Sequence, residues 1–383
     1  MADIDGTCDD GFGGVREAFS ANFDRGLDVG ASVSVVLDGQ TVVDLWGGSI
    51  DGTAEEPGPT PWQRDTITNV WSTTKTMTAL CALMLVDRGE LDPYAPVARY
   101  WPEFKAAGKE QVTVAHLMSH TSGLSGWQAP MAPEDLYDWD LACAQLAAQE
   151  PWWEPGTASG YHAVTQGYLV GEVIRRIDGR SVGRFFAEEV AGPLGADFFI
   201  GTPASADDRV ARVIPPPPLD AQIADADPTS IAVRTFVNPP LSAEQSWEPA
   251  WRRAEIPAAG GHGNARSVAR VQAVLAHGGE LDGVRLLSEA GCRRALEPQI
   301  SGTDLVLGTP LSFGLGYGLI TPETPLSPNE HACFWGGWGG SLVVVDMDAR
   351  LCFAYVMNRM GEGTMGDLRA VEILFAAYGA LEA

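Results

Sequence analysis

The spacing of apolar residues predicts a helix and then two strands at the start of the chain. Over residues 13–23 the large apolar side chains recur every four positions, which is typical of an amphipathic helix. Residues 31–37 and 41–46 are rich in valine and are separated by a three-residue segment that contains Gly39. Two such runs joined by a short polar turn indicate a β-hairpin.

A third apolar segment is longer and has a different composition. Residues 77–86 are nearly all apolar and contain no Gly or Pro, and Arg88 and Gly89 follow them. A glycine commonly follows the last turn of a helix, and a cation near that end interacts favourably with the helix dipole. We therefore predict a buried helix, with Ser72 in its first turn and Lys75 on the same face.

The middle of the chain shows helical spacing interrupted by loops. Helices are expected over residues 114–119, 138–149, 165–177 and 182–190. Four consecutive prolines within residues 214–218 predict a stiff surface connection. Residues 219–258 are rich in Pro, Ala and acidic side chains, and we expect a long irregular loop there.

Segments with strand character return only near the C-terminus. Strands are expected at residues 313–320, 332–335, 341–346 and 351–357, and a last helix at 366–378. The two N-terminal strands have no other candidate partners along the chain. Strands from both ends of the chain are therefore expected to join in one sheet.

These elements predict an α+β fold. A discontinuous domain, residues 1–76 and 260–383, is expected to hold an antiparallel sheet flanked by helices. A mainly helical domain, residues 77–259, is expected to be inserted into it.

Composition and charge narrow the functional classes. Of the 383 residues, 45% are hydrophobic and 20% are charged, as in globular proteins, and the net charge is −25. This acidic balance argues against nucleic acids and anionic membranes as partners, because both are polyanions. The acidic N-terminus lacks the basic and apolar regions of a secretory signal, and the apolar segment after Lys75 is too short to span a bilayer.

Cysteine and histidine spacing indicates neither disulfides nor metal sites. The six cysteines are scattered without a Cys-x-x-Cys pair, which fits reduced thiols in a cytoplasmic protein. His116 and His120 are four residues apart, but no third ligand completes a metal set. We therefore expect a cytoplasmic protein that needs no metal and no cofactor.

Lys75 stands out among the basic residues. Only three of the 25 basic residues are lysines, and the other two, Lys105 and Lys109, lie in a polar segment that we expect to be exposed. Ser72 is the only serine that precedes a lysine by three residues. Burial can neutralise an amine, which can then act as a base, whereas a guanidinium cannot do so. The alternative is a buried lysine whose ammonium reaches the surface along its flexible stem.

Two further segments could complete a catalytic site. Tyr161 follows a turn-rich loop, and a nearby lysine ammonium would lower the pKa of its hydroxyl. Tyr161 could then take the Ser72 proton or protonate a leaving group. Residues 336–340 contain four glycines, which let a ligand approach backbone N–H groups as an oxyanion hole requires. The alternatives are a half-buried aromatic residue and a tight turn at a sheet edge.

Together these segments resemble the serine β-lactamase and penicillin-binding-protein superfamily, in the class C-like branch that includes family VIII carboxylesterases. Ser72-Thr73-Thr74-Lys75 is similar to the nucleophile motif, and residues 117–124 are similar to the Leu-x-x-His-Thr-Ser-Gly-Leu signature. Tyr161-His162-Ala163 falls where class C enzymes have Tyr-x-Asn. Trp335-Gly336-Gly337 falls where they have Lys-Thr-Gly, and Trp-Gly-Gly resembles the form in family VIII esterases.

The resemblance implies a β-lactamase-like fold and a serine hydrolase that cleaves carboxylic esters through an acyl-enzyme, with its active site in the cleft between the two domains. Ser72 would be the nucleophile, and Lys75 and Tyr161 would act as acid and base. The N–H groups of Ser72 and Trp338 would form the oxyanion hole. His120 would have a structural role. Substrate contacts are expected from Trp335, Gly336, Gly337, His162 and Trp127.

Two departures from the family pattern argue against strong β-lactamase activity. Ala163 replaces the asparagine that holds the substrate amide, and Trp335 replaces the lysine that helps to hold the β-lactam carboxylate. An acyltransferase, an amide or oligomer hydrolase, a D-aminopeptidase and a weak β-lactamase stay open as alternatives. A catalytically silent binding protein is a further one. The expected partner is a small-molecule ester or amide, and the sequence leaves a homo-oligomer open.

Overall fold

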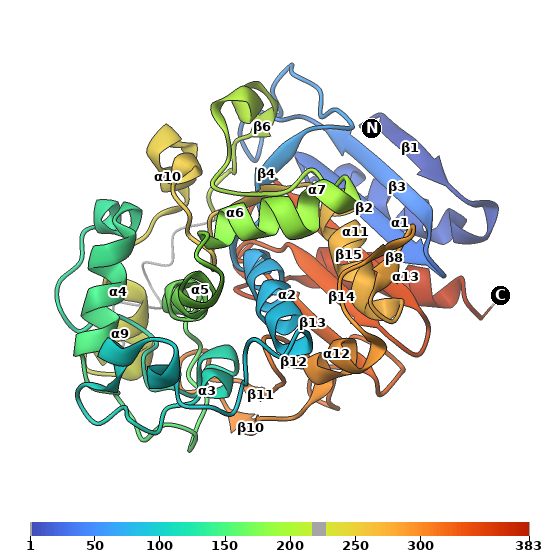
Figure 1. Cartoon of the computed structure of the whole chain (residues 1–383). Helices are drawn as coiled ribbons and strands as arrows, with labels where there is room; N and C mark the ends of the chain where they lie inside the picture. Colours follow the sequence, from blue (N-terminus) through green and yellow to red (C-terminus); the bar gives the residue numbers. More distant parts are fainter. Residues whose placement is uncertain (1, 217–226, 383) are drawn as a thin grey trace.

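A nine-stranded antiparallel sheet built from both ends of the chain dominates one side of the molecule (Figure 1). The computed structural model describes residues 2–216 and 227–382. The strand order is β1-β3-β2-β15-β14-β13-β12-β11-β10. The strands are β1 (Ile4–Cys8), β2 (Gly30–Leu37), β3 (Gln40–Gly48), β10 (Ile300–Thr303), β11 (Pro310–Phe313), β12 (Gly318–Leu319), β13 (Ala332–Gly336), β14 (Leu342–Asp346) and β15 (Leu351–Met357).

The two chain ends meet where β2 pairs with β15. Val33 lies opposite Tyr355 and Val35 opposite Phe353, and all four side chains are fully buried. Because this pair is central in the sheet, apolar residues cover both of its faces. The blue and the red strands lie side by side in Figure 1. The predicted α+β fold with one sheet from both ends is confirmed.

Helices from both chain ends pack on this sheet. Helix α1 (Gly13–Asp24) lies against α13 (Leu368–Gly379), and α11 (Ala265–Ala276) lies against β2, β14 and β15. The predicted helices at 13–23 and 366–378 are thereby confirmed to within two residues. A short β8 (Glu280–Leu281) and β9 (Val284–Arg285) hairpin and α12 (Glu289–Arg293) follow α11.

Helix α2 (Thr74–Asp87) lies near the centre of the molecule, among the other helices (Figure 1). Every residue from Thr74 to Leu85 is buried, as the nearly all-apolar run from residue 77 onward predicted. Helices α5, α6, α11 and α12 contact it. The other helices of this side are α3 (Val114–Met118), α4 (Trp139–Ala148), α5 (Thr165–Asp178), α6 (Val182–Phe186) and α7 (Gly192–Leu194).

A small second sheet brings together segments from both predicted domains. Its order is β5 (Phe199–Ile200), β7 (Gly261–Gly263), β4 (Ile67–Asn69) and β6 (Val210–Ala211). Strands β4 and β7 come from the discontinuous domain, and β5 and β6 come from the inserted one. The division at residues 76 and 260 stays a prediction. The small sheet holds β4, the strand that leads into α2.

Three local predictions were wrong. Residues 313–320 do not form one strand, because the chain reverses after Phe313 and β11 pairs with β12. Within 219–258, residues 227–258 contain α9 (Ile231–Val237) and α10 (Pro249–Arg253), and the Ser230 hydroxyl caps α9. Residues 217–226, which include the end of the proline run, lie outside the described part. Lys109 is fully buried, since its ammonium donates to the carbonyls of Ala106 and Gln149.

None of the helices in residues 2–216 and 227–382 is long and apolar enough to cross a membrane. Within the same two ranges, no cluster of three or more His, Cys, Asp or Glu side chains could hold a metal ion.

Candidate active site

Ser72 lies in a single 3₁₀ turn, Trp71–Thr73, between β4 and α2. Ser72 therefore precedes the first α-helical turn. The sequence-based prediction had placed it within that turn. Trp71 has a φ of 48°, in the left-handed region that a bulky side chain rarely adopts. Its ring is held between the rings of Trp251 and Trp338, at centroid distances of 5.6 and 4.9 Å. This packing holds the strained residue directly before Ser72.

Lys75 is buried beside Ser72, with its amine in three short contacts. Its Nζ lies 3.0 Å from Ser72 Oγ, 2.7 Å from the Ala163 carbonyl oxygen and 3.0 Å from the Ala258 carbonyl oxygen. Burial lowers the pKa of Lys75 well below its usual value. A neutral amine has two N–H groups for the two carbonyls and one lone pair. That lone pair can accept the Ser72 hydroxyl proton, as a base must.

Tyr161 contacts Ser72 from the other side. Its hydroxyl donates to Ser72 Oγ at 2.5 Å, and Lys75 Nζ lies 4.8 Å from its ring centroid. The sequence-based expectation of a lowered Tyr161 pKa was wrong. Burial raises the pKa of Tyr161, and the hydrogen bond to Ser72 only partly opposes that effect. The raised pKa favours the neutral phenol, which is a proton donor.

A buried carboxylate that the sequence did not single out holds the backbone at Tyr161. Asp304 Oδ1 accepts the N–H of Tyr161 at 3.0 Å and the N–H groups of Val306 and Leu307, each at 2.9 Å. Asp304 is 1% exposed. The loop between β10 and β11 thereby fixes the Tyr161 loop. Asp304 lies 143 residues after Tyr161, so no local pattern could reveal this contact.

The glycine-rich end of β13 lies directly against the nucleophile. A Cβ added to Gly337 would collide with the Val70 carbonyl oxygen and would lie 3.3 Å from the Ser72 nitrogen. Only glycine permits this approach. Ser341 ties the two segments together: its hydroxyl donates to the Val70 carbonyl at 2.9 Å and lies 2.9 Å from the Thr73 hydroxyl oxygen. Trp338 follows Gly337, so its N–H belongs to the same loop.

Three other residues that were expected to contact substrate, Trp335, His162 and Trp127, are almost completely buried. Trp335 is 1% exposed and packs against Tyr161, Phe313 and His120. His162 is fully buried, and its two ring nitrogens contact the Ser122 hydroxyl at 2.7 Å and the Gly160 carbonyl at 2.6 Å. Trp127 is 2% exposed, and its indole N–H donates to the Ala142 carbonyl. These contacts favour a supporting role for His162 and Trp127 over contact with substrate.

The Tyr161 side chain also belongs to an apolar cluster. A buried cluster of Tyr161, Trp335, Val306, Leu311 and Phe313 is bordered by partly exposed Ala163, Ile231, Leu307 and Met365. These bordering side chains come from four separate segments of the chain. A ligand at Ser72 would therefore meet methyl and methylene groups beside the reactive hydroxyl.

Comparison with known proteins places the chain in a family. A model of the beta-lactamase family matches residues 19–378. The chain belongs to the beta-lactamase family. The esterase/beta-lactamase LipL of Mycobacterium tuberculosis is 36% identical over 367 residues, which cover 93% of this chain and 83% of LipL.

Solved structures of this family support the same assignment. A family VIII carboxylesterase is 44% identical with a TM-score of 0.91, covering 99% of this chain and all of that one. A penicillin-binding-protein homologue from Caulobacter crescentus is 41% identical with a TM-score of 0.87, over 99% of this chain and all of that one. The chain is a serine hydrolase of the esterase and β-lactamase type.

Replacing Ser72 by alanine should abolish turnover of a nitrophenyl ester and labelling by an active-site-directed phosphonate, because no nucleophilic oxygen remains. Mass spectrometry should find one phosphonate adduct, on the peptide that carries Ser72, and circular dichroism should show a folded variant. The matched control is Ser122→Ala, which should still be labelled at Ser72. An adduct on Ser122 or Ser341 would refute the assignment.

Lys75 should act as a neutral base, which predicts a specific pH profile. Acylation, followed as kcat/KM, should fall as the pH drops through the lowered pKa of Lys75, since the protonated amine cannot accept a proton. On the alkaline side it should show no loss up to about pH 10, the ordinary tyrosine pKa, because burial raises that of Tyr161. Lys75→Arg should lose roughly 100- to 10,000-fold. Substantial activity in Lys75→Arg would contradict this role.

Proposed function

We propose that this hydrolase cleaves uncharged carboxylic esters with short acyl groups through an acyl-enzyme on Ser72. The observation that carries the proposal is the double contact at the Ser72 oxygen. A buried amine lies 3.0 Å away and a phenol hydroxyl lies 2.5 Å away. One group can remove a proton from the serine while the other can supply one to a departing alcohol.

Acylation follows from these positions. Ser72 attacks the ester carbonyl as its proton passes to Lys75 Nζ. The N–H groups of Ser72 and Trp338 stabilise the oxyanion. The Trp338 N–H lies in the loop that approaches Ser72 closely at Gly337. Tyr161 then protonates the leaving alkoxide, and the proton on Lys75 restores the phenol. The products of this half-reaction are an alcohol and the Ser72 ester.

Deacylation uses the same groups in reverse. A water molecule takes the place of the alcohol, and the Tyr161 and Lys75 pair accepts its proton as it attacks the acyl carbonyl. The tetrahedral intermediate collapses, releases the carboxylic acid and returns the proton to Ser72. A small alcohol that entered instead of water would make the enzyme an acyltransferase.

The preference for uncharged esters rests on the charges around the site. Arg252 and Arg253 of α10 are two candidate substitutes for the cation of the missing lysine, and both are paired with Asp207. Asp207 and Arg252 line a separate cavity of about 450 Å³, to which neither Ser72 nor Tyr161 contributes. A substrate carboxylate near Trp335 would therefore lose water without gaining a charged partner, and this costs several kcal/mol.

A weak β-lactamase is the second candidate, because the relative LipL is named as both an esterase and a beta-lactamase. The nucleophile and base would serve either reaction. The difference lies in substrate binding. At the positions where class C enzymes bind the lactam, this chain has the Ala163 methyl group and the Trp335 indole.

We expect kcat/KM for a short nitrophenyl ester to exceed that for nitrocefin by roughly two orders of magnitude or more, which reflects the uncompensated desolvation of the β-lactam carboxylate. Both substrates should be measured on one enzyme preparation whose active sites have been titrated with a phosphonate. The matched variant Ala163→Asn restores one amide contact, and it should raise nitrocefin turnover more than ester turnover. Comparable efficiencies for the two substrates in the unmodified enzyme would overturn the esterase assignment.

A further inference from the structure

The loop that carries Trp338 is held by a charged network centred on Arg369. Gly339, the next residue, has a φ of 91°, in the left-handed region that glycine readily adopts. It has no side chain to pack, so hydrogen bonds must hold it. Its N–H donates to the Gly363 carbonyl at 2.8 Å, and its own carbonyl accepts from Gly361 N at 2.8 Å and from Arg369 Nη2 at 2.7 Å.

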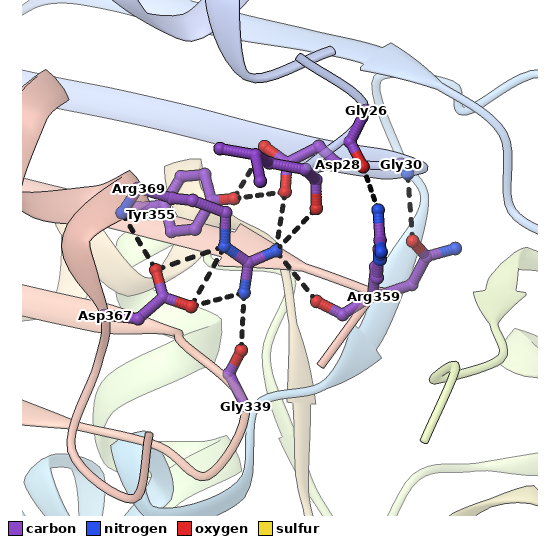
Figure 2. A network of polar contacts seen from close by, with 10 residues as sticks. Gly26, Asp28, Gly30, Gly339, Tyr355, Arg359, Asp367 and Arg369 are labelled. Carbon is purple, nitrogen blue, oxygen red and sulfur yellow. Dashed lines mark hydrogen bonds and ion pairs between the residues drawn. The ribbon is translucent and has the colours of Figure 1, made fainter. Parts of the chain in front are cut away.

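Arg369 is buried at the start of α13 and uses its whole guanidinium (Figure 2). Its side chain is only 8% exposed. Nη1 donates to Asp28 Oδ1 at 2.9 Å and to the carbonyls of Leu27 and Arg359, each at 3.0 Å. Nε and Nη2 donate to the Asp367 carboxylate. The planar fork thus joins three segments of the chain to the Gly339 carbonyl.

The Asp28 end of this network is also held by hydrogen bonds. Asp28 is fully buried, and it accepts the Tyr355 hydroxyl at 2.6 and 2.7 Å (Figure 2). Burial raises the pKa of Asp28, and the adjacent Arg369 opposes that shift. Charges taken this far from water are tolerated where they are fully paired, and such pairs fix a single geometry. The guanidinium is therefore held in place on the side opposite Gly339.

We propose that Arg369 is a positioning residue for catalysis. By holding the Gly339 carbonyl, it sets the place of the Trp338 N–H relative to Ser72, and so the ability of the site to stabilise an oxyanion. The inference rests on the proposed function, in which the Trp338 N–H is one of the two oxyanion donors. Arg369 contacts neither the substrate nor any reacting atom.

The variant Arg369→Lys tests this role, because it keeps the charge and removes the planar fork. A lysine cannot reach Gly339, Asp28 and Arg359 together. We expect kcat/KM for nitrophenyl butyrate to fall roughly ten- to a hundredfold, less than when an oxyanion donor is removed outright. The affinity for an alkyl boronic acid, which forms a tetrahedral anion on a serine oxygen, should fall by the same factor.

Two controls separate positioning from general loosening. The uncharged amide that matches the boronic acid binds as a ground-state ligand, and its affinity for Arg369→Lys should stay within about twofold of wild type. Arg266 forms a comparable pair elsewhere: Nη1 contacts the Asp44 carboxylate at 3.1 and 3.2 Å, and Nη2 donates to the Arg64 carbonyl. Arg266→Lys should retain the boronic acid affinity.

Unchanged boronic acid affinity in Arg369→Lys would overturn the proposal, as would an equal loss of amide affinity or an equal loss in Arg266→Lys. If Arg369→Lys does not fold, Asp28→Asn takes its place. Asp28→Asn weakens the far anchor of the guanidinium and should lower kcat/KM and boronic acid affinity in parallel, by about three- to tenfold. Unchanged boronic acid affinity in folded Asp28→Asn would equally overturn it.

Phosphonate labelling of the wild type separates this proposal from the proposed function. If the phosphonate labels a residue other than Ser72, the proposed function fails. If it labels Ser72 while Arg369→Lys retains its boronic acid affinity, only the positioning role fails.

Discussion

The burial of one lysine amine underlies the chemistry of this protein. Lys75 Nζ is buried on a helix that has no exposed residue over its first three turns. Its hydrogen-bond contacts among the described residues are the Ala163 and Ala258 carbonyl oxygens and Ser72 Oγ. Carbonyl dipoles do not compensate a full charge, so burial lowers the pKa of Lys75 well below its usual value and favours the neutral amine. A neutral amine can act as a base. Burial likewise raises the pKa of Tyr161 and favours its phenol form, a proton donor.

Backbone groups do most of the positioning around this amine. The acceptors for Lys75 are carbonyls, the Val70 carbonyl receives Ser341, and Gly337 approaches Ser72 through its lack of a side chain. The geometry of the site therefore depends on how three separate segments pack, more than on which side chains they carry.

The proposed oxyanion loop lies at the junction of the two chain ends. Strand β15 pairs with β2, and the Arg369 network joins the segment before β2, the end of β15 and the start of α13 to Gly339. The proposed nucleophile, Ser72, comes from the helical side, and the proposed second oxyanion donor, the Trp338 N–H, comes from the end of a sheet strand. Their relative position thus depends on pairing between residues more than 300 positions apart in the chain.

The sequence by itself determined the local elements and the reactive pair. The β2–β3 hairpin, the buried α2 and the Ser72–Lys75 spacing are carried by neighbouring residues, whose apolar runs and turn residues indicate the local element. Only the tertiary structure decided the direction of the Tyr161 pKa shift, the burial of Lys109 and the contacts of Asp304 and Arg369. The reason is physical: the loss of water around a group, and its distant partners, depend on every segment packed against it.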